Sequence, residues 1–337
     1  MTGNAGTAHL RDGGLLEVRH LEQRFRLPSG DVVHAVSDVS FDVFPGETLG
    51  LVGESGCGKS TAVRSILQAP RPTGGTVRFG SVELTSADSA TLRDARRSIQ
   101  LVFQDPHSSL NPRWTVEECL MEPLDVHRVG DRRSRQARVR ELVELVGLEA
   151  RAHLDRRPGQ LSGGQCQRVG IARALALAPE LVLFDEAVSS LDVSIQAQIL
   201  NLIGDLQREL SLTSVFIAHD LAVVKHVSDR VGVMYLGALC EIGPADEIYR
   251  SPAHPYTAAL LSSIPQPDPA HGSRHNRTQL VGDLPSPVDP PSGCRFRTRC
   301  LYATEECAAE QPAMREFQPG QFAACHHPLQ PPRAREA

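Results

Sequence analysis

The feature that most constrains this chain is a glycine-rich run that begins at Gly53 and ends at Ser60. It follows the apolar run 48–52 and precedes a helical pattern over residues 61–67, which is the order of strand, turn and helix that a phosphate-binding loop requires. Glycines let the backbone wrap around a polyphosphate, while the helix N-terminus and Lys59 supply positive charge. Ser60 offers a hydroxyl to Mg²⁺. We therefore predict that the chain binds a nucleotide. The residues expected to hold it here are Gly53, Glu54, Ser55, Gly56, Cys57, Gly58, Lys59, Ser60 and Thr61.

A second acidic motif stands at the end of a continuous apolar run. Residues 181–184 are typical of a parallel strand that is covered on both faces, and Asp185 and Glu186 follow directly. Open α/β sheets bind their ligands at the carboxyl ends of such strands. We expect Asp185 to hold Mg²⁺ through water and Glu186 to polarise an attacking water molecule.

Three further positions follow predicted strands or open a helix. Gln104 ends the apolar run 99–103, and His219 ends the apolar run 213–218. Ser162, Gly163, Gly164 and Gln165 begin a predicted helix that continues to residue 177, where backbone N–H groups suit an anion. Taken alone, this start also fits a simple capped helix.

Alternating apolar and polar residues over 16–19 and 36–43 predict two strands that a turn at 28–31 joins as a hairpin. Short strands are predicted at 76–79 and 82–84. Phe25 ends the first run, and its spacing does not decide between a core position and a ring that stacks on adenine.

Composition excludes several classes of function. The formal net charge is -5 and the sequence pI is about 6.2, whereas a nucleic-acid-binding surface is usually basic. The longest apolar stretch, 174–184, contains Pro179 and Glu180 and is too short to cross a bilayer. Residues 1–6 lack the charged start and apolar core of a secretory signal. We therefore expect a soluble chain in the cytosol that has no nucleic-acid partner.

Four of the eight cysteines lie close together near the end of the sequence. They are Cys294, Cys300, Cys307 and Cys325, with spacings of C-x5-C, C-x6-C and C-x17-C. In a reducing cytosol, such a group favours a metal or cluster site over disulfides. The spacing matches neither the tight pairs of common zinc sites nor the usual ferredoxin runs. An iron–sulfur cluster, zinc and unligated thiols all remain open on spacing alone.

The motifs together resemble the ATP-binding cassette (ABC) ATPases over about residues 16–262. In chain order they are the phosphate-binding loop, Gln104, 162–165, Asp185 and Glu186, 190–192, and His219. Residues 103–106 and 109–113, the stretch 191–198 and the tail from Leu284 to Cys325 resemble the oligopeptide/dipeptide importer branch. Cys166 and the stretch 218–226 look most like the F-type ATPase subunit of that branch. Ala187 stands where that family usually has proline, and Phe184 where it often has a small residue. Neither departure removes a catalytic group.

This resemblance implies an α/β fold of the P-loop NTPase class. Its core would be a RecA-like mixed sheet with an antiparallel β subdomain and an α-helical signature subdomain at about 105–165. Residues 1–262 would form the nucleotide-binding domain. Residues 263–337 would form a small, irregular, cysteine-rich extension. In relatives this extension carries an iron–sulfur cluster, which favours a 4Fe–4S cluster at the four cysteines with zinc as the alternative.

The resemblance also assigns roles around ATP and Mg²⁺. Two cassettes would face each other head to tail, so that Ser162, Gly163, Gly164 and Gln165 serve the partner's nucleotide. Glu186 would be the general base, His219 would hold the γ-phosphate, and Gln104 would contact Mg²⁺ and the water. Phe25 would stack on adenine, and Asp192 would signal across the dimer. Mg²⁺ would be held by Ser60, Gln104 and Asp185.

The implied function is the ATP-hydrolysing, energy-coupling subunit of a membrane importer for oligopeptides or dipeptides. Its partners would be two multi-span permease subunits, a second D-like ATPase subunit and an extracytoplasmic peptide-binding protein, and it would sit on the cytoplasmic face of the plasma membrane. The alternatives are a soluble ABC ATPase of translation or repair, and an importer of nickel or glutathione. A catalytically silent subunit is disfavoured by the presence of Glu186 and His219.

Overall fold

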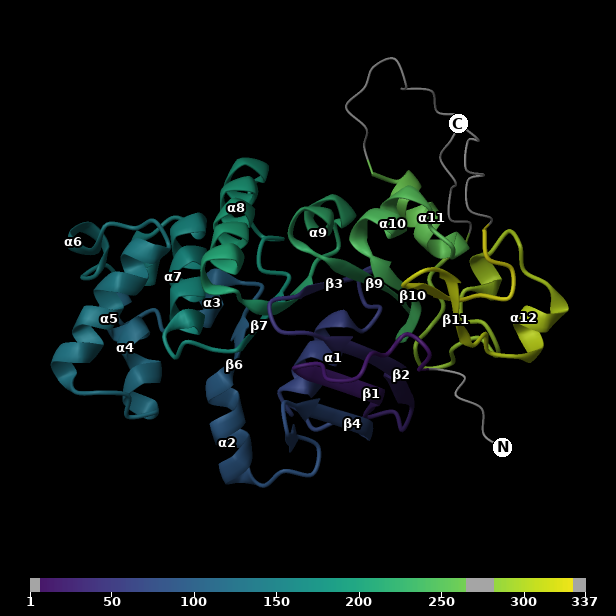
Figure 1. The fold of residues 1–337 in the computed structure, drawn as a ribbon, viewed down its shortest axis with the longest axis horizontal. Coiled ribbons are helices and arrows are strands. Elements are labelled where there is room, and N and C mark those ends of the chain that lie inside the picture. Colours follow the sequence, from purple (N-terminus) through teal and green to yellow (C-terminus); the bar gives the residue numbers. More distant parts are fainter. Residues whose placement is uncertain (1–6, 265–281, 330–337) are drawn as a thin grey trace, which may run out of the picture. The chain divides into compact units, whose positions relative to one another are not determined.

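The computed structural model describes residues 7–264 and 282–329, and these residues form two compact units. The described part of the first unit contains residues 7–44, 48–86, 219–264 and 282–329, and the second contains 45–47 and 87–218. Each unit has its own strands and covering helices (Figure 1). The chain therefore leaves the first unit and returns to it, so that segments far apart in sequence build one structure.

An antiparallel sheet in the first unit confirms the strands predicted between residues 16 and 84. Its strands are β1 (Leu16–Arg26), β2 (Val32–Val43), β4 (Gly74–Phe79) and β5 (Val82–Glu83), in the order β2-β1-β4-β5. The turn at 27–31 closes β1 and β2 into the expected hairpin, with Arg26 opposite Val32. Val18, Leu21 and Phe41 are fully buried, because alternating side chains of a strand point to one face of the sheet.

The phosphate-binding loop connects a strand and a helix of the same unit. β3 (Thr48–Val52) pairs in parallel with β9 (Arg230–Tyr235), and β9 pairs antiparallel with β10 (Ala238–Pro244). The loop leads from β3 into α1 (Lys59–Ile66), and α9 (Leu221–Val227) packs on β3. A side chain at Gly50 would place a Cβ 2.2 Å from Val224, so the glycine permits this close packing. After β10 follow α10 (Ala245–Arg250) and α11 (Pro255–Ser262).

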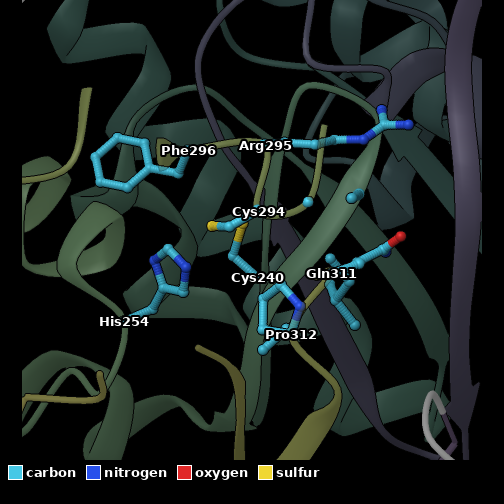
Figure 2. A pocket seen from close by; sticks show the side chains of 11 residues that line it. Cys240, His254, Cys294, Arg295, Phe296, Gln311 and Pro312 are labelled. Carbon is cyan, nitrogen blue, oxygen red and sulfur yellow. The ribbon is translucent and has the colours of Figure 1, made fainter. Parts of the chain in front are cut away.

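The C-terminal segment, residues 282–329, is more regular than its sequence suggests. It contains the short helices η4 (Arg297–Arg299) and α12 (Glu305–Ala309), and the hairpin β11 (Met314–Gln318) and β12 (Gln321–Ala324). β12 pairs antiparallel with β10, so the segment extends a sheet of the first unit (Figure 1). The prediction of an irregular extension is therefore wrong at this hairpin. A small pocket beside β10 is lined by Cys240, Cys294 and Phe296, among others (Figure 2).

The second unit contains a parallel sheet and most of the helices. Its strands are β6 (Ile99–Val102), β7 (Leu181–Asp185) and β8 (Thr213–Ile217), with β7 paired in parallel to both neighbours. Every residue of β7 and β8 is buried, as predicted for strands covered on both faces. The helices, including one 3-10 turn, are α2 (Ser89–Ser98), α3 (Pro106–Ser109), α4 (Val116–Val126), α5 (Arg132–Leu145), α6 (Ala150–His153), η1 (Pro158–Gln160), α7 (Gly163–Leu175) and α8 (Val193–Leu210).

The predicted helical part at about 105–165 lies entirely within the second unit, where α4, α5 and α7 pack on one another. The predicted boundary between residues 262 and 263 does not coincide with a division between the compact units, because residues 282–329 belong to the first. An independent domain boundary there stays a prediction, since residues 265–281 lie outside the described residues. Within the residues described, no helix is both long and apolar enough to span a bilayer.

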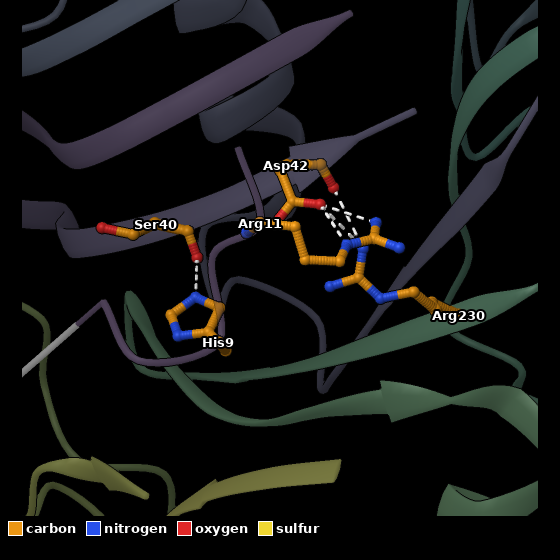
Figure 3. A network of polar contacts seen from close by, with 5 residues as sticks. All are labelled: His9, Arg11, Ser40, Asp42 and Arg230. Atoms are coloured by element: carbon orange, nitrogen blue, oxygen red, sulfur yellow. Dashed lines mark hydrogen bonds and ion pairs between the residues drawn. The ribbon is translucent and has the colours of Figure 1, made fainter. Parts of the chain in front are cut away.

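A buried carboxylate ties the start of the described chain to the sheets of the first unit. Asp42 on β2 is fully buried, and its carboxylate accepts hydrogen bonds from Arg11 at 2.6 Å and 2.8 Å and from Arg230 at 3.1 Å (Figure 3). His9 lies nearby and pairs with the carbonyl oxygen of Ser40 at 2.6 Å. Burial lowers the pKa of His9. Asp42 thus joins β2, β9 and the residues before β1.

We predict that Asp42→Ala lowers the free energy of unfolding by about 3 kcal/mol, because it removes the buried carboxylate from its ion pair with the largely buried Arg230. Arg11 is 44% exposed, so Arg11→Ala is the matched control and should cost less than about 1 kcal/mol. Urea unfolding followed by circular dichroism measures both. Equal midpoints for the two variants would contradict the role given to the buried carboxylate.

Candidate functional site

The phosphate-binding loop has the backbone conformation that its glycines were expected to permit. Gly53, Gly56 and Gly58 have φ values of 152°, 79° and 102°, in a region that side chains disfavour. Space is also limited, because a Cβ at Gly58 would lie 2.1 Å from the carbonyl oxygen of Ala35. The helix α1 begins directly after Gly58. The sequence prediction of strand, loop and helix is confirmed here.

Lys59 is held by the loop that precedes it. Its ammonium donates hydrogen bonds to the carbonyl oxygens of Gly53 at 2.8 Å and Glu54 at 3.1 Å, and the residue is 3% exposed. Cys57 lies beside it, with the sulfur 3.6 Å from the ammonium. Burial raises the pKa of the Cys57 thiol. Ser60 and Thr61 are half-buried at the start of α1. The buried positive charge is thus fixed inside the loop that would enclose a polyphosphate.

Contacts from distant segments hold the loop, and sequence reasoning missed them. The Tyr256 hydroxyl accepts a hydrogen bond from the Glu54 N–H at 2.9 Å. The Gly237 N–H donates to the Cys57 carbonyl oxygen at 2.9 Å. Arg299 of the C-terminal segment pairs with the Glu54 carboxylate. Tyr256 and Arg299 follow Glu54 by about 200 residues or more, and no local pattern in the sequence announces such a pairing.

The second unit brings Gln104 and Glu186 together, as expected for two groups that act on one water molecule. The Gln104 amide nitrogen donates to a Glu186 carboxylate oxygen at 2.8 Å. Glu186 has a φ of 51°, unusual for a residue with a side chain, and its N–H donates to the carbonyl oxygen of Ile217 at 3.1 Å. Ser190 donates to the Gln104 carbonyl oxygen at 3.3 Å. Asp185 ends β7 and is 1% exposed.

The predicted signature residues open a helix through a reciprocal cap. Ser162 accepts from the Gln165 N–H at 3.3 Å, and the Gln165 side chain accepts from the Ser162 N–H at 3.0 Å. This is a capping box, which stabilises the first turn of α7. A Cβ at Gly164 would lie 2.4 Å from Ile195, so α8 packs closely on this turn. Gly163 is half-buried beside Leu191.

The remaining predicted site residues lie at element ends or on the surface. Asp192 caps α8 by accepting from the Ile195 N–H at 3.0 Å, and this bond lowers its pKa. His219 is exposed, follows β8 after Ala218 and belongs to the first unit. Phe25 on β1 is 38% exposed. Of the two readings left open for Phe25, a buried core position is wrong, and adenine stacking stays a prediction.

The residues predicted to hold Mg²⁺ supply suitable atoms. Ser60, Gln104 and Asp185 offer a hydroxyl, an amide and a carboxylate oxygen, the hard oxygen ligands that magnesium prefers. Ser60 belongs to the first unit, and Gln104 and Asp185 belong to the second. The donor set therefore fits the ion that accompanies a nucleoside triphosphate.

The structure does not support the predicted 4Fe–4S cluster, nor the zinc alternative. Cys294, Cys300, Cys307 and Cys325 are close enough for the other three to influence Cys325, whose pKa is raised to about 12, mainly by burial. Yet among residues 7–264 and 282–329, no three His, Cys, Asp or Glu side chains are placed to share a metal ion. In the part of the chain that the structure describes, the four thiols lie near one another, but they do not form a set of metal ligands.

Local contacts of the individual thiols explain this difference. Cys294 lines a pocket together with Cys240, which lay outside the predicted set (Figure 2). The Cys300 sulfur accepts from the Tyr302 N–H at 3.4 Å, and the Cys307 sulfur lies 3.7 Å from the Thr304 hydroxyl. Burial raises the pKa of the Cys294 and Cys300 thiols. This geometry therefore does not support the prediction of a metal-binding extension.

Comparisons with known families and proteins agree with the order of these motifs. Residues 36–189 match the family described as ABC transporter, and residues 240–307 match the family described as oligopeptide/dipeptide transporter, C-terminal region. YkfD of Bacillus subtilis, provisionally named an oligopeptide transport ATP-binding protein, is 50% identical over 316 residues, 93% of this chain and 95% of the relative. The oligopeptide transport ATP-binding protein AppF of the same organism is 48% identical over 93% of this chain and 97% of its own length.

A solved structure supports the fold. It is a dimeric ATP-binding cassette in a post-hydrolysis state, bound to ADP and Pi, and it is 30% identical to this chain. It aligns with a TM-score of 0.62 and covers 68% of this chain and 98% of its own. The P-loop fold predicted from the sequence is thus confirmed.

We predict that Gly58→Ala weakens ATP binding by roughly tenfold or more, because a Cβ there meets a backbone carbonyl at a strained φ. Gly56→Ala is the matched control. Gly56 also has a positive φ, but no heavy atom of the described residues lies within 4 Å of its Cβ position. Titration of fluorescent ATP into each purified chain measures the two affinities. Equal losses would show that strain, and not the contact with Ala35, governs the loop.

Proposed function

The chain belongs to the ATP-binding proteins of ABC transporters, and we propose that it couples ATP hydrolysis to the import of oligopeptides or dipeptides. The observation that carries the peptide class is the match of residues 240–307 to the C-terminal region of oligopeptide/dipeptide transporters. Relatives that share about half of its residues over nearly their whole length are named for peptide transport. Nickel or glutathione import remains the alternative within the same family.

Hydrolysis of ATP fits the groups that the chain presents. The loop residues from Gly53 to Thr61 would enclose the phosphates, and Lys59 would neutralise charge on the β- and γ-phosphates. Mg²⁺, held by Ser60, Gln104 and Asp185, would supply charge stabilisation at the phosphoryl oxygens. Glu186 would accept the proton of the attacking water, whose oxygen bonds to the γ-phosphorus while the bond to ADP breaks. Gln104 supports this role, because its hydrogen bond orients the Glu186 carboxylate.

Other roles follow from assembly with a second cassette. Ser162, Gly163, Gly164 and Gln165 would contact the nucleotide of a partner subunit through the N-terminus of α7. His219 would bind the γ-phosphate, Phe25 would stack on adenine, and Asp192 would respond to the partner. The dimeric state of the solved cassette relative supports such an arrangement. We propose a different, D-like ATPase chain as the partner here.

The complete importer would contain two multi-span permease subunits and an extracytoplasmic peptide-binding protein. This chain would attach to the permeases from the cytoplasmic side. ATP would close the pair of cassettes and hydrolysis would reopen them, a two-state switch that γ-phosphate contacts bias.

We predict that Glu186→Gln lowers the rate of phosphate release at least about 100-fold, since it removes the general base. ATP affinity should stay within about threefold of the unchanged protein, because the loop residues are intact. Glu209→Gln is the control, since Glu209 is an exposed carboxylate near the end of α8. Phosphate release by the reconstituted complex measures the rate. Unchanged turnover in Glu186→Gln would refute the assigned role.

We predict that a tagged chain, purified from gently solubilised membranes, brings down two multi-span permeases and a second ATPase chain. Mass spectrometry of the recovered chains is the measurement, and the Glu186→Gln variant with ATP should strengthen recovery by holding the cassettes closed. An associated binding protein, tested with peptides, nickel and glutathione, identifies the substrate. Recovery with ribosomes or repair factors alone would contradict the importer and favour a soluble ABC ATPase.

A further inference from the structure

The C-terminal segment reaches the phosphate-binding loop through one ion pair. The two terminal nitrogens of Arg299 donate to the two carboxylate oxygens of Glu54 at 2.7 Å and 3.1 Å. The side chain of Arg299 is 7% exposed and that of Glu54 is 27% exposed. Two parallel hydrogen bonds between a planar guanidinium and a carboxylate are the strong, geometrically specific form of this interaction. The pair therefore links the loop firmly to η4.

The same segment also supports the backbone of Glu54. Phe296 lies one turn before Arg299, and its ring contacts Tyr256 with centroids 5.3 Å apart and Tyr235 with centroids 5.2 Å apart. Tyr235 and Tyr256 contact each other at 4.7 Å, and the Tyr256 hydroxyl accepts from the Glu54 N–H. All three rings are buried. Glu54 is thus held at its side chain by Arg299 and at its backbone by a ring that Phe296 packs against.

Hydrogen bonds on the N-terminal side of η4 keep this part of the segment in place. The carbonyl oxygen of Pro287 accepts from the His34 N–H at 2.9 Å. Arg295 donates to the carbonyl oxygen of Leu236. The next residue, Gly237, donates to the Cys57 carbonyl oxygen of the loop. Two routes therefore connect the segment to the loop, one through Glu54 and one through the turn between β9 and β10.

Electrostatics give the ion pair a consequence for nucleotide binding. Glu54 places a carboxylate in the loop that would enclose a polyphosphate, and like charges at this range repel each other. Arg299 neutralises that carboxylate, and the hydrogen bonds that it donates to Glu54 in turn raise the pKa of Arg299. The guanidinium thus stays charged throughout the ordinary pH range. Without it, an unpaired negative charge would face the phosphates.

We propose that Arg299 is a positioning residue of the nucleotide site, and that through it the C-terminal segment controls the affinity of the phosphate-binding loop for ATP. The proposal deepens the ATPase function proposed above and rests on it. Arg299 would not touch the nucleotide. It would hold Glu54 away from the phosphates and cancel its charge, so that the order of the C-terminal segment and the occupancy of the loop depend on each other.

The test compares Arg299→Met, Glu54→Gln and the double variant in the full chain. Arg299→Met should weaken the binding of Mg-ATP about tenfold, because it leaves Glu54 unpaired. ADP binding should fall less, since ADP carries less negative charge. Glu54→Gln provides the background for the double variant, and adding Arg299→Met to it should cause no further loss, because no carboxylate is left for Arg299 to neutralise. Isothermal titration of the unchanged chain and the three variants with Mg-ATP and with Mg-ADP measures these affinities.

Two further variants separate positioning from folding. Arg297→Met is the matched control, because Arg297 lies on the same short helix but donates to Ser292 at 2.9 Å and not to the loop. It should bind Mg-ATP as the unchanged chain does. Arg299→Lys keeps the charge but loses the paired geometry and should fall between the two. Hydrogen exchange should rise at residues 53–58 in Arg299→Met and stay unchanged in Arg297→Met.

Three results of these titrations would overturn the role proposed for Arg299. Unchanged ATP affinity in Arg299→Met would overturn the inference and leave the ATPase function standing. A loss in Arg299→Met that persists in the double variant would also overturn it, because the effect would then not depend on the Glu54 charge. Failure of the unchanged chain to bind Mg-ATP would overturn the proposed function together with the inference.

Discussion

The hydrogen bonds of Lys59 to two carbonyl groups of its own loop are the interaction on which the nucleotide site depends. They place a buried ammonium within a turn that contains three glycines with positive φ. Contacts from outside the loop add to these internal hydrogen bonds. β3 and α1 fix its ends, while the β9–β10 turn, Tyr256 and Arg299 hold its middle. Several elements of the first unit therefore hold the phosphate-binding loop in one conformation.

Hydrophobic periodicity and short local motifs were enough to predict much of the fold. The alternating pattern of β1 and β2 and the unbroken apolar run of β7 predicted strands that the structure confirms, because burial of one or both faces dictates those patterns. The reciprocal cap of Ser162 and Gln165 and the loop before Lys59 were equally readable, since each uses residues within a few positions of one another. Structure that depends on neighbouring residues was therefore predicted correctly from the sequence.

What the sequence did not reveal depends on contacts between distant residues. The hairpin β11–β12 consists of two short strands, and β12 joins a sheet by pairing with the distant β10. Resemblance to relatives with an iron–sulfur cluster predicted a cluster at the four cysteines, but among the described residues no three potential ligands are placed to share a metal ion. Phe25 could not be placed because a single aromatic residue at a strand end fits either face. The sequence did not single out Arg299 as part of the site, because its partner, Glu54, lies 245 residues earlier.

Glu186 and Glu54 show that the role of a carboxylate depends on the group to which it is hydrogen-bonded. Glu186 accepts from Gln104, a neutral amide that orients the carboxylate without adding positive charge. A general base needs that combination of fixed direction and retained charge. Glu54 instead meets Arg299, whose charge cancels its own. In the role proposed for Arg299, this pairing removes the repulsion between the Glu54 carboxylate and a polyphosphate. The C-terminal segment would then contribute to nucleotide binding, although Arg299 lies 245 residues after Glu54 in sequence.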